Sequence, residues 1–272
     1  MALTFYKMSG SGNDFVVFDG RQRPLDRLTD PRVIEEICSR RTGVGADGIV
    51  LLLPSTEADI RMAYYNRDGS RAEMCGNAAL CVTSLVARLD ANEGRDIRLE
   101  TDIGVLPARS VAEGHLAEVE LRPVSLVAAN AGISREQGER RIGFADAGVP
   151  HLIVLVDELE GVEVQTRGGA LRRHRSLAQG ANVNFVAGTG EGWAMRTYER
   201  GVEAETLACG TGAVAVAALL CAWGESGAES SIRTRSGAVL TVRLREDAGG
   251  LMPTLRGEGR LVFTGQLDEP GL

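Results

Sequence analysis

Two cysteines of this chain share one unusual setting, in which a glycine and a small polar residue follow the thiol and open an apolar helix. The first copy reads Cys-Gly-Asn at 75–77 and the second reads Cys-Gly-Thr at 209–211. The residues before them also match, with Tyr-Tyr-Asn-Arg at 64–67 against Thr-Tyr-Glu-Arg at 197–200. One thiol on either side of a carbon atom can take a proton from one face and return a proton to the other. The repeat therefore predicts two similar half-molecules that share a two-thiol site.

The start of a helix suits this proton chemistry. Its backbone amides carry about half a unit of positive charge, which favours a neighbouring thiolate and lowers its pKa from the free value of about 8.5. The same amides can hold a carboxylate, and glycine lets the backbone approach that anion closely. We expect the amides of Gly76, Asn77, Gly210 and Thr211 to bind the carboxylate of an α-amino acid. Two adjacent thiols would titrate as a coupled pair, with one thiolate and one thiol.

The sequence is rich in short β-like runs separated by glycine-containing turns. In the first half, strands are expected at residues 4–8, 15–18, 48–53, 59–65, 97–101, 105–111 and 116–121. In the second half, they are expected at residues 142–147, 151–156, 182–187, 193–198, 231–234, 239–244, 251–256 and 260–264. Helices are predicted over residues 33–41, 76–90 and 210–224, with a weaker one over 159–175. Asp30 before Pro31 is a typical helix start, a capping side chain followed by proline.

The helices that follow the two cysteine motifs are apolar nearly all round, so other elements must enclose them. We therefore predict an α+β fold of two pseudo-symmetric domains, each a curved, mostly antiparallel sheet wrapped around a central helix. A boundary near Arg122-Pro123 would give an N-terminal half over 1–122 and a C-terminal half over 123–259. The last segment, 260–272, is expected to return to the first half.

The composition narrows the class of protein. The chain has 272 residues, of which 44% are hydrophobic and 25% charged, as in globular proteins. A net charge of −7 argues against nucleic-acid or acidic-membrane partners. The amino terminus does not resemble a signal peptide, and the longest apolar stretch, 213–223, is about half of a bilayer span. With an odd number of cysteines, we expect a cytoplasmic protein with reduced thiols.

The sequence indicates neither a metal nor an organic cofactor. The histidines at 115, 151 and 174 fall in no metal-ligand spacing. Lys7 is the single lysine and is not in an obvious Schiff-base setting, and we find no standard phosphate-binding glycine loop. Cys38, Cys81 and Cys221 lie inside apolar helices without a flanking glycine, so we interpret them as structural thiols.

Several further motifs, in order along almost the whole chain, complete the pattern. They are Ser-Gly-Ser-Gly-Asn-Asp-Phe at 9–15, Gly-Val-Gly-Ala-Asp-Gly at 43–48, Asn-Arg-Asp-Gly-Ser at 66–70, Gly-Val-Pro-His at 148–151, Ala-Asn-Val-Asn-Phe at 181–185 and Tyr-Glu-Arg-Gly at 198–201. Together with the two cysteine motifs they resemble the diaminopimelate epimerase family. That resemblance implies cofactor-independent interconversion of LL- and meso-2,6-diaminopimelate, in lysine and peptidoglycan synthesis, by a protein that is usually a homodimer.

The resemblance also implies roles for individual residues. It makes Cys75 and Cys209 the acid–base pair, with roles that swap with the direction of the reaction. Substrate contacts are implied for Asn13, Asn66, Gly76, Asn77, Asn182, Glu199, Arg200, Gly210 and Thr211. Tuning of the thiol pKa values is implied for His151 and Glu199. A planar arginine fork suits a distal carboxylate, and asparagines can both donate to carboxylate and accept from ammonium.

Three positions depart from the family pattern, and three other functions stay open. Val149 replaces a common asparagine and would remove one contact to the distal group, while Leu80 and Gly48 replace an arginine and a glutamine. A related racemase of proline, hydroxyproline or histidine is the nearest alternative, although proline-type relatives tend to carry histidine where Asn77 stands. A reversible disulfide between Cys75 and Cys209 would instead indicate a redox protein, and a plain binding protein needs no matched thiols.

Overall fold

Apolar runs with alternating or continuous burial make β-strand the predominant secondary structure of this chain. The structure, a computed structural model, describes residues 2–111, 115–247 and 250–268. Its contacts divide the chain into two compact units, which we call unit 1 (Met1–Val119 with Arg256–Leu272) and unit 2 (Glu120–Leu255). The boundary that the sequence suggested near Arg122-Pro123 stays a prediction.

Unit 1 builds its sheet from residues at both ends of the chain. Its elements are β1 (Leu3–Gly10), β2 (Asn13–Asp19), η1 (Asp26–Thr29), α1 (Pro31–Cys38), β3 (Gly48–Leu53), β4 (Ile60–Asn66), β5 (Arg71–Ala72), α2 (Gly76–Leu89), β6 (Asp96–Thr101), β7 (Gly104–Val111), β8 (Leu116–Glu120) and β18 (Arg260–Leu267). The β18 strand pairs antiparallel with β1. Helix α1 begins as the sequence predicted, because the Asp30 side chain accepts from the Arg32 amide and Pro31 occupies the first turn.

The elements of unit 2 are β9 (Leu126–Ala128), β10 (Glu139–Asp146), β11 (Pro150–Val156), η2 (Val164–Gly168), α3 (Gly169–Arg172), β12 (Asn182–Thr189), β13 (Gly192–Glu199), β14 (Ala204–Thr206), α4 (Gly210–Ala222), β15 (Glu229–Arg233), β16 (Val239–Asp247) and β17 (Gly250–Glu258). From β10 onwards, unit 2 repeats the element order that unit 1 shows from β1, and its first strand, β9, pairs with β10 as β18 pairs with β1.

The strand pairings of the two units correspond one to one. The β1–β2 and β10–β11 pairs are antiparallel, and the β2–β3 and β11–β12 pairs are parallel. The β3–β4 and β12–β13 pairs are antiparallel, and the β4–β6 and β13–β15 pairs are parallel. Phe15 pairs with Gly48 as His151 pairs with Asn182, so the two registers can be superimposed residue by residue. The internal repeat that the cysteine motifs suggested thus extends to the whole sheet.

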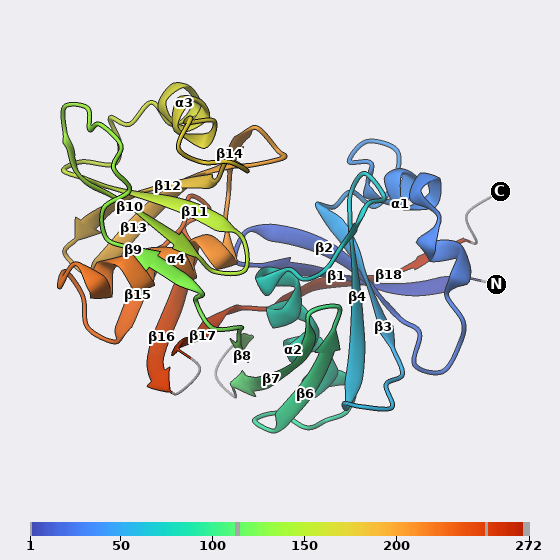
Figure 1. Cartoon of the computed structure of the whole chain (residues 1–272). Coiled ribbons are helices and arrows are strands. Elements are labelled where there is room, and N and C mark those ends of the chain that lie inside the picture. The colour runs from blue at the N-terminus through green and yellow to red at the C-terminus, as the bar shows by residue number, and fades with distance from the viewer. Residues whose placement is uncertain (1, 112–114, 248–249, 269–272) are drawn as a thin grey trace. The chain divides into compact units, whose positions relative to one another are not determined.

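Each unit encloses one helix, as Figure 1 shows for α2 and α4. Helix α4 is buried from Ala213 to Leu220 without a polar face, and α2 is buried along most of its length. On the other face of each sheet, a second core packs under a shorter helical segment, α1 in unit 1 and η2 with α3 in unit 2. The predicted α+β class, with curved sheets around central helices, is confirmed.

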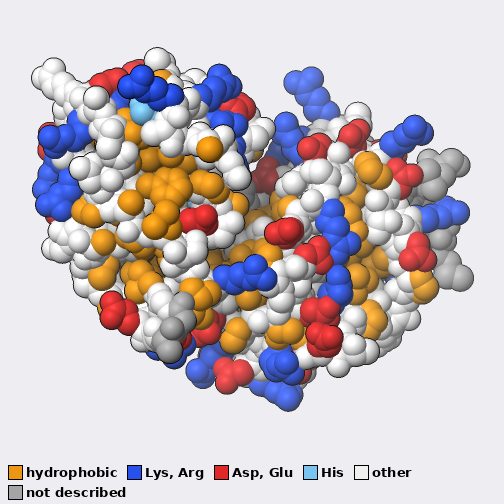
Figure 2. All heavy atoms as spheres, in the orientation of Figure 1, with side chains coloured by type: hydrophobic (Ala, Val, Ile, Leu, Met, Phe, Trp, Pro, Cys, Tyr) orange, Lys and Arg blue, Asp and Glu red, His pale blue; other side chains and the backbone are white. Residues whose placement is uncertain are grey.

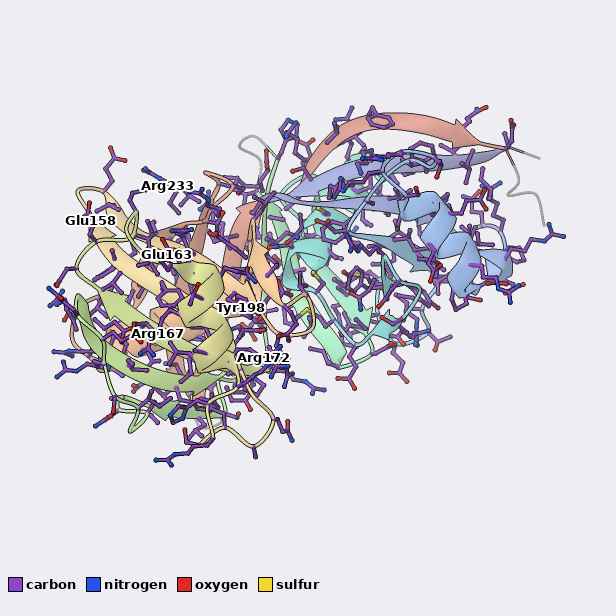
Figure 3. All side chains as sticks on the ribbon, turned by 90° about the horizontal axis from the view of Figure 1, so that it is seen from above. Glu158, Glu163, Arg167, Arg172, Tyr198 and Arg233 are labelled. Carbon is purple, nitrogen blue, oxygen red and sulfur yellow. The ribbon has the colours of Figure 1, made fainter. Side chains whose placement is uncertain are left out.

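Some element predictions were wrong. The helix expected over 159–175 is only a π-helical turn, η2, followed by one short turn, α3. Figure 3 shows this segment beside Tyr198, and a Cβ on Gly168 would lie 2.6 Å from the Tyr198 Cβ. Glycine therefore allows a close approach to the sheet, at the expense of helix propensity. The sequence also missed the short strands β5, β9 and β14, which are too brief to show a period.

The surface carries charges of both signs. Figure 2 shows acidic and basic side chains interspersed over the face in view. None of the helices in the described part of the chain is long and apolar enough to span a bilayer.

Candidate active site

In unit 1, Cys75 is the residue on which α2 begins. Its backbone is extended, with φ −136° and ψ 121°, and its carbonyl accepts the first helical bond from the Ala79 amide at 2.9 Å. The amides of Gly76 and Asn77 come before that first bond, so they point out of the helix start. The thiol is half-buried and makes no capping hydrogen bond to α2. The turn therefore places a thiol and a group of amide donors at the positive end of a helix.

A chain of amide hydrogen bonds lies beside Cys75. The Asn13 amide nitrogen donates to Asp47 Oδ2 at 3.1 Å, and the Asn77 amide nitrogen donates to Asn13 Oδ1 at 2.6 Å. Because an ionised carboxylate only accepts, Asp47 fixes the orientation of both amides. Asn77 is 2% exposed, and its Oδ1 has no partner among the described residues. A buried acceptor of this kind requires a donor, which a bound ammonium or amide group can supply.

An ionic cluster fixes this chain of amides to the sheet. The buried Lys7 donates to Asp14 at 2.6 Å and to the Gly45 carbonyl, and Arg40 donates to both Asp14 and Asp47. Burial opposes ionisation of Asp14, but the hydrogen bonds from Arg40 and Lys7 outweigh it and lower its pKa. Asp14 consequently stays charged near neutral pH, and Asp47, held by Arg40, keeps Asn13 in place.

In unit 2, the second cysteine is more enclosed. Cys209 also has an extended backbone, with φ −143° and ψ 109°, and is 8% exposed. Its sulfur accepts a hydrogen bond from the Gly212 amide at 3.3 Å and lies 3.6 Å from the Thr211 hydroxyl. Donors directed at a sulfur stabilise the thiolate over the thiol.

A buried polar network continues from Thr211. His151 Nε2 lies 3.1 Å from Thr211 Oγ1, and His151 Nδ1 lies 3.0 Å from the Asn184 amide nitrogen. The Asn184 oxygen accepts from the Thr197 hydroxyl at 2.9 Å. Burial, with a smaller contribution from the charge of Arg200, lowers the pKa of His151 from 6.5 to about 3. The imidazole is therefore neutral at physiological pH and acts as a hydrogen-bonding group rather than a charged one.

Space for this network depends on Gly212. A Cβ at that position would lie 2.5 Å from Asn184 Oδ1 and 3.1 Å from Cys209 Sγ. Such a distance is far inside van der Waals contact, so any side chain at residue 212 would displace the amide or the thiol. Glycine inside a helix normally costs about 1 kcal/mol of stability relative to alanine. Its presence at residue 212 therefore indicates that the backbone must come this close to Asn184 and Cys209.

The remaining predicted residues lie at strand ends in the two units. Asn66 ends β4 and donates to Ser70 Oγ at 3.0 Å, which gives it a role in its own turn. Asn182 begins β12, and its side-chain oxygen accepts the Arg200 amide at 2.8 Å. The Arg200 guanidinium donates to the Gln179 carbonyl at 3.1 Å, and Glu199 is the last residue of β13. Asn182 therefore holds the turn that carries Glu199 and Arg200.

Within unit 1 the structure brings Asn13, Asn77 and Cys75 together at the start of α2, whereas Asn66 is tied into its turn. Within unit 2 it brings His151 and Thr211 beside Cys209, with Asn182 and Arg200 as a second pair. Sequence reasoning missed four residues of these networks: Asp47, Asn184, Thr197 and Gly212. A signal existed for two of them, since Asn184 follows Asn182 at strand spacing in an apolar run and Gly212 replaces the Ala78 of the first copy.

The other cysteines do not join these networks. Cys38 ends α1, where burial raises the pKa of its thiol to about 12. Cys81 is fully buried in α2, and burial raises the pKa of its thiol well above the usual value. Both are held as neutral thiols, in agreement with their structural interpretation. In the ranges that the structure describes, no group of histidine, cysteine and carboxylate side chains is placed to hold a metal ion.

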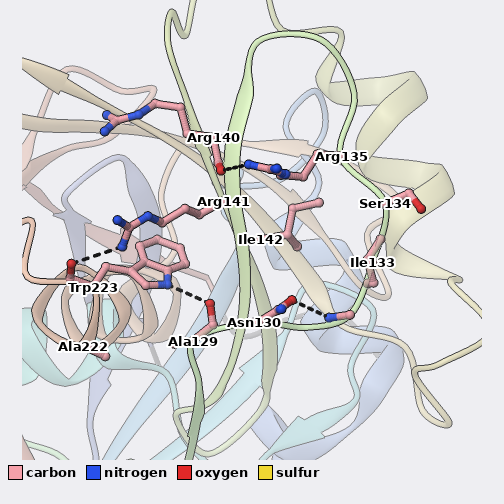
Figure 4. Close-up of a pocket in the computed structure, with 11 residues that line it drawn as sticks. Ala129, Asn130, Ile133, Ser134, Arg135, Arg140, Arg141, Ile142, Ala222 and Trp223 are labelled. Atoms are coloured by element: carbon pink, nitrogen blue, oxygen red, sulfur yellow. Dashed lines mark hydrogen bonds between the residues drawn. The ribbon is translucent and has the colours of Figure 1, made fainter.

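A separate hollow of about 690 Å³ lies at the opposite end of α4 from Cys209 (Figure 4). Arg141 lies over the Trp223 ring at 5.9 Å there, and the indole donates to the Ala129 carbonyl at 2.8 Å. Glu225 pairs with both Arg140 and Arg141. Since α4 spans Gly210–Ala222, about 20 Å of helix separates this hollow from the thiol. It forms no part of the cysteine site.

Comparison with known proteins agrees with the motif pattern. The diaminopimelate epimerase family model matches residues 5–127 and 143–257. A diaminopimelate epimerase from Gemmatimonas aurantiaca is 47% identical over 277 residues, covering 97% of this chain and 99% of that protein. Among solved structures, a PhzF-family phenazine biosynthesis protein of Bacillus anthracis has a TM-score of 0.79 at 16% identity, covering 99% of this chain and 100% of its own. A hydroxyproline epimerase from Agrobacterium vitis has a TM-score of 0.66 at 23% identity, covering 99% and 94%.

Proposed function

The chain belongs to the diaminopimelate epimerase family, and on this premise we propose that it interconverts LL- and meso-2,6-diaminopimelate by moving a proton at one Cα between two thiols. The observation that carries the proposal is the duplicated turn, in which Cys75 and Cys209 each open a buried helix with the same extended backbone. As an isomerase of this kind, the enzyme needs no oxidant, and the proton is the only group transferred.

The proposed reaction has two proton transfers. A thiolate removes the Cα proton, so that a C–H bond breaks, an S–H bond forms and the electron pair passes into the carboxylate as an enolate. The opposite thiol then gives its proton to the other face of Cα, so that its S–H bond breaks and a C–H bond forms. The two cysteines have exchanged protonation states at the end, which is why either can act as base in the two directions.

The helix starts supply the electrostatic stabilisation. In this proposal the amides of Gly76 and Asn77 from α2, and of Gly210 and Thr211 from α4, donate to the reacting carboxylate. These bonds strengthen as the carboxylate gains enolate charge, which lowers the barrier selectively. Each amide donor of this type is worth about 3 kcal/mol in comparable oxyanion sites.

The polar residues around the two turns would select the substrate. We assign the distal end of the substrate chiefly to Arg200, Asn182, Asn66 and Asn13, and the ammonium side to Glu199. Asn182 also holds the Arg200 backbone in place. The buried Oδ1 of Asn77 accepts a further N–H from the substrate. His151 acts on the thiol pKa through Thr211, and Glu199 through its charge. A substrate without the distal group would leave these polar atoms unpaired, so it would be rejected.

Two further proposals concern assembly and compartment. We propose a homodimer that covers β18, where Val262 and Phe263 are 46% and 48% exposed. We propose a cytoplasmic location because the mechanism needs two reduced thiols. Sedimentation equilibrium of the protein and of Phe263→Ser tests the first point. A wild-type dimer that becomes monomeric in the variant supports this interface, and a wild-type monomer contradicts it.

The function is tested by incubating reduced protein with LL-diaminopimelate and resolving the stereoisomers by chiral chromatography. We expect a mixture of LL and meso forms that is the same when the reaction starts from either isomer. Proline, hydroxyproline and histidine serve as competing substrates, and Cys221→Ala as the control variant. Racemisation of one of these amino acids without turnover of diaminopimelate would replace the substrate assignment by that of a related racemase.

A further inference from the structure

We infer that Asn184 is a positioning residue that sets the tautomer of His151 and so directs the Thr211 hydroxyl proton to the Cys209 sulfur. The inference deepens the proposed function, on which its catalytic meaning rests. The hydrogen bonds themselves, however, all lie within unit 2, and they can be measured without any turnover of substrate.

The starting point is a backbone carbonyl that can only accept. The Asn184 amide nitrogen donates to the Leu152 carbonyl oxygen at 3.3 Å, while its oxygen accepts from the Thr197 hydroxyl at 2.9 Å. Turning the amide over would place two oxygens against each other at Leu152. The strand pairing of β11 with β12 fixes that carbonyl, so the orientation of the Asn184 amide is fixed as well.

The direction of the next bond follows. The same Asn184 nitrogen lies 3.0 Å from His151 Nδ1, which must therefore accept and carry no proton. A neutral imidazole has one N–H, so the proton is on Nε2 and is donated to Thr211 Oγ1 at 3.1 Å. Thr211 has then used its oxygen as an acceptor, and its own hydrogen is available for the sulfur 3.6 Å away.

The chain of bonds ends on Cys209 with two donors, the Thr211 hydroxyl and the Gly212 amide. His151 and Asn184 are 0% exposed, so solvent does not compete for these bonds. Arg200 is the charged group that acts on His151, and it also favours the neutral ring. Two donors on one sulfur stabilise its anion, so this relay favours the thiolate form of Cys209.

The tautomer can be observed directly, because the chain has only three histidines. Long-range ¹H–¹⁵N spectra of the full-length protein with ¹⁵N-histidine, with His115→Gln and His174→Gln for assignment, report the two ring nitrogens of His151. We expect a neutral ring with a protonated Nε2 from about pH 5 to about pH 8. A protonated Nδ1, or a ring that becomes imidazolium within this range, would overturn the inference.

Variants test the connection to the sulfur. Asn184→Val, Thr211→Val and Thr197→Val are compared by the rate of iodoacetamide alkylation of Cys209 near pH 7, with peptide mass spectrometry to identify the site. We expect about a tenfold decrease for Asn184→Val and Thr211→Val. The Nε2–H tautomer should be lost only in Asn184→Val. Thr197→Val keeps the bonds to Leu152 and His151, so it should retain both the tautomer and the alkylation rate.

An unchanged alkylation rate in both Asn184→Val and Thr211→Val would contradict the relay. If Asn184→Val does not fold, the wild-type tautomer and the Thr211→Val rate decide the question alone. Turnover of diaminopimelate by the wild type is measured separately. A protein with the expected tautomer but no epimerase activity would refute the proposed function and leave the relay intact.

Discussion

Beneath Cys209 the sheet of unit 2 carries His151, Asn184 and Thr197, whereas the same register positions in unit 1 carry Phe15, Val50 and Tyr64. The first set is a hydrogen-bonded network. In the second, the Phe15 and Tyr64 rings meet edge to face at 5.9 Å. The two units therefore support the same cysteine turn in different ways, one with directed hydrogen bonds and the other with apolar packing.

This difference teaches how one backbone turn can serve two chemical roles. Burying a polar group costs free energy unless its hydrogen bonds are made, and in unit 2 the network supplies partners to His151, Asn184 and Thr197. Once complete, it delivers a proton donor to the sulfur. In unit 1, packing of Phe15 against Tyr64 contributes stability but sets no hydrogen-bond direction. The polar chain of that unit, from Asp47 through Asn13, ends on Asn77 instead.

The polar chains of the two units also start at different places. Asn13 reaches Asn77 from a position two residues before Phe15, and the corresponding residue of unit 2 is Val149. His151 reaches Thr211 from the position that Phe15 occupies in unit 1. The two copies of the fold thus carry their polar residues at different register positions, and this asymmetry gives the two thiols unequal surroundings.

The largest effect is expected from making the two helix starts alike. In Gly212→Ala, which copies Ala78 of the first cysteine motif, the new Cβ would lie 2.5 Å from Asn184 Oδ1. We expect a loss of about 3 kcal/mol of unfolding free energy and about a hundredfold in kcat/KM. Urea denaturation and the epimerase assay measure the two effects.

The control for this substitution is Gly169→Ala, where a Cβ would be no closer than 3.4 Å to any neighbour. It adds the same methyl group to a helical glycine, so its stability should stay within about 1 kcal/mol of the wild type. If Gly212→Ala behaves like this control, the close approach to Asn184 has no energetic consequence.

A smaller effect is expected from placing the amide of unit 2 into unit 1. Val50→Asn puts a polar side chain at a fully buried position, without the His151 and Thr197 side-chain partners that Asn184 has in unit 2. We predict a loss of about 2 to 3 kcal/mol in denaturant unfolding. Val50→Ala is the matched control for lost packing, and an equal or smaller cost for the asparagine would show that unit 1 can satisfy the amide.

Acid should act on the network of unit 2 before it acts on the ion pairs of unit 1. The pKa of His151 is about 3 in the folded chain and 6.5 in the unfolded chain. Between these two values the unfolded chain binds a proton at this residue that the folded chain does not bind. Its contribution to stability is full above pH 6.5 and decreases as the pH falls. Between pH 7.5 and 5 we expect a loss of about 2 kcal/mol.

His151→Phe, which copies Phe15 of unit 1, should remove this slope in denaturant unfolding. The lowered pKa of Asp14 affects stability only below its usual 3.8, so unit 1 contributes no change in the same interval through this group. The same pH slope in the variant as in the wild type would mean that another group titrates there.

The smallest effect is expected at a thiol outside both networks. Cys221, near the end of α4, is half-buried and far along the helix from Cys209. Cys221→Ala should leave kcat/KM within about twofold of the wild type, as for a substitution that touches neither turn. A large loss would place a third thiol in the chemistry and break the pairing of Cys75 with Cys209.

Much of this arrangement could be predicted from the sequence, because the signals are local. Repeated Cys-Gly motifs identify the helix starts, all-apolar segments identify α2 and α4, and alternating runs identify most strands. The supporting residues could not be found in this way. Asn184 and Thr197 meet His151 only through the strand register, and Gly212 is required by an oxygen 28 residues earlier in the chain. Contacts of this kind depend on tertiary structure that no short-range pattern encodes.

The most direct test of the two-thiol mechanism is α-proton exchange in deuterated water, followed by NMR and mass spectrometry. Reduced wild-type protein, Cys75→Ala and Cys209→Ala are each given LL-diaminopimelate. With two bases, deuterium should enter the meso product before it enters the remaining LL substrate, and both variants should lose conversion by at least about a hundredfold. Conversion that survives the loss of either cysteine, or deuterium that enters the LL form first, would contradict the account.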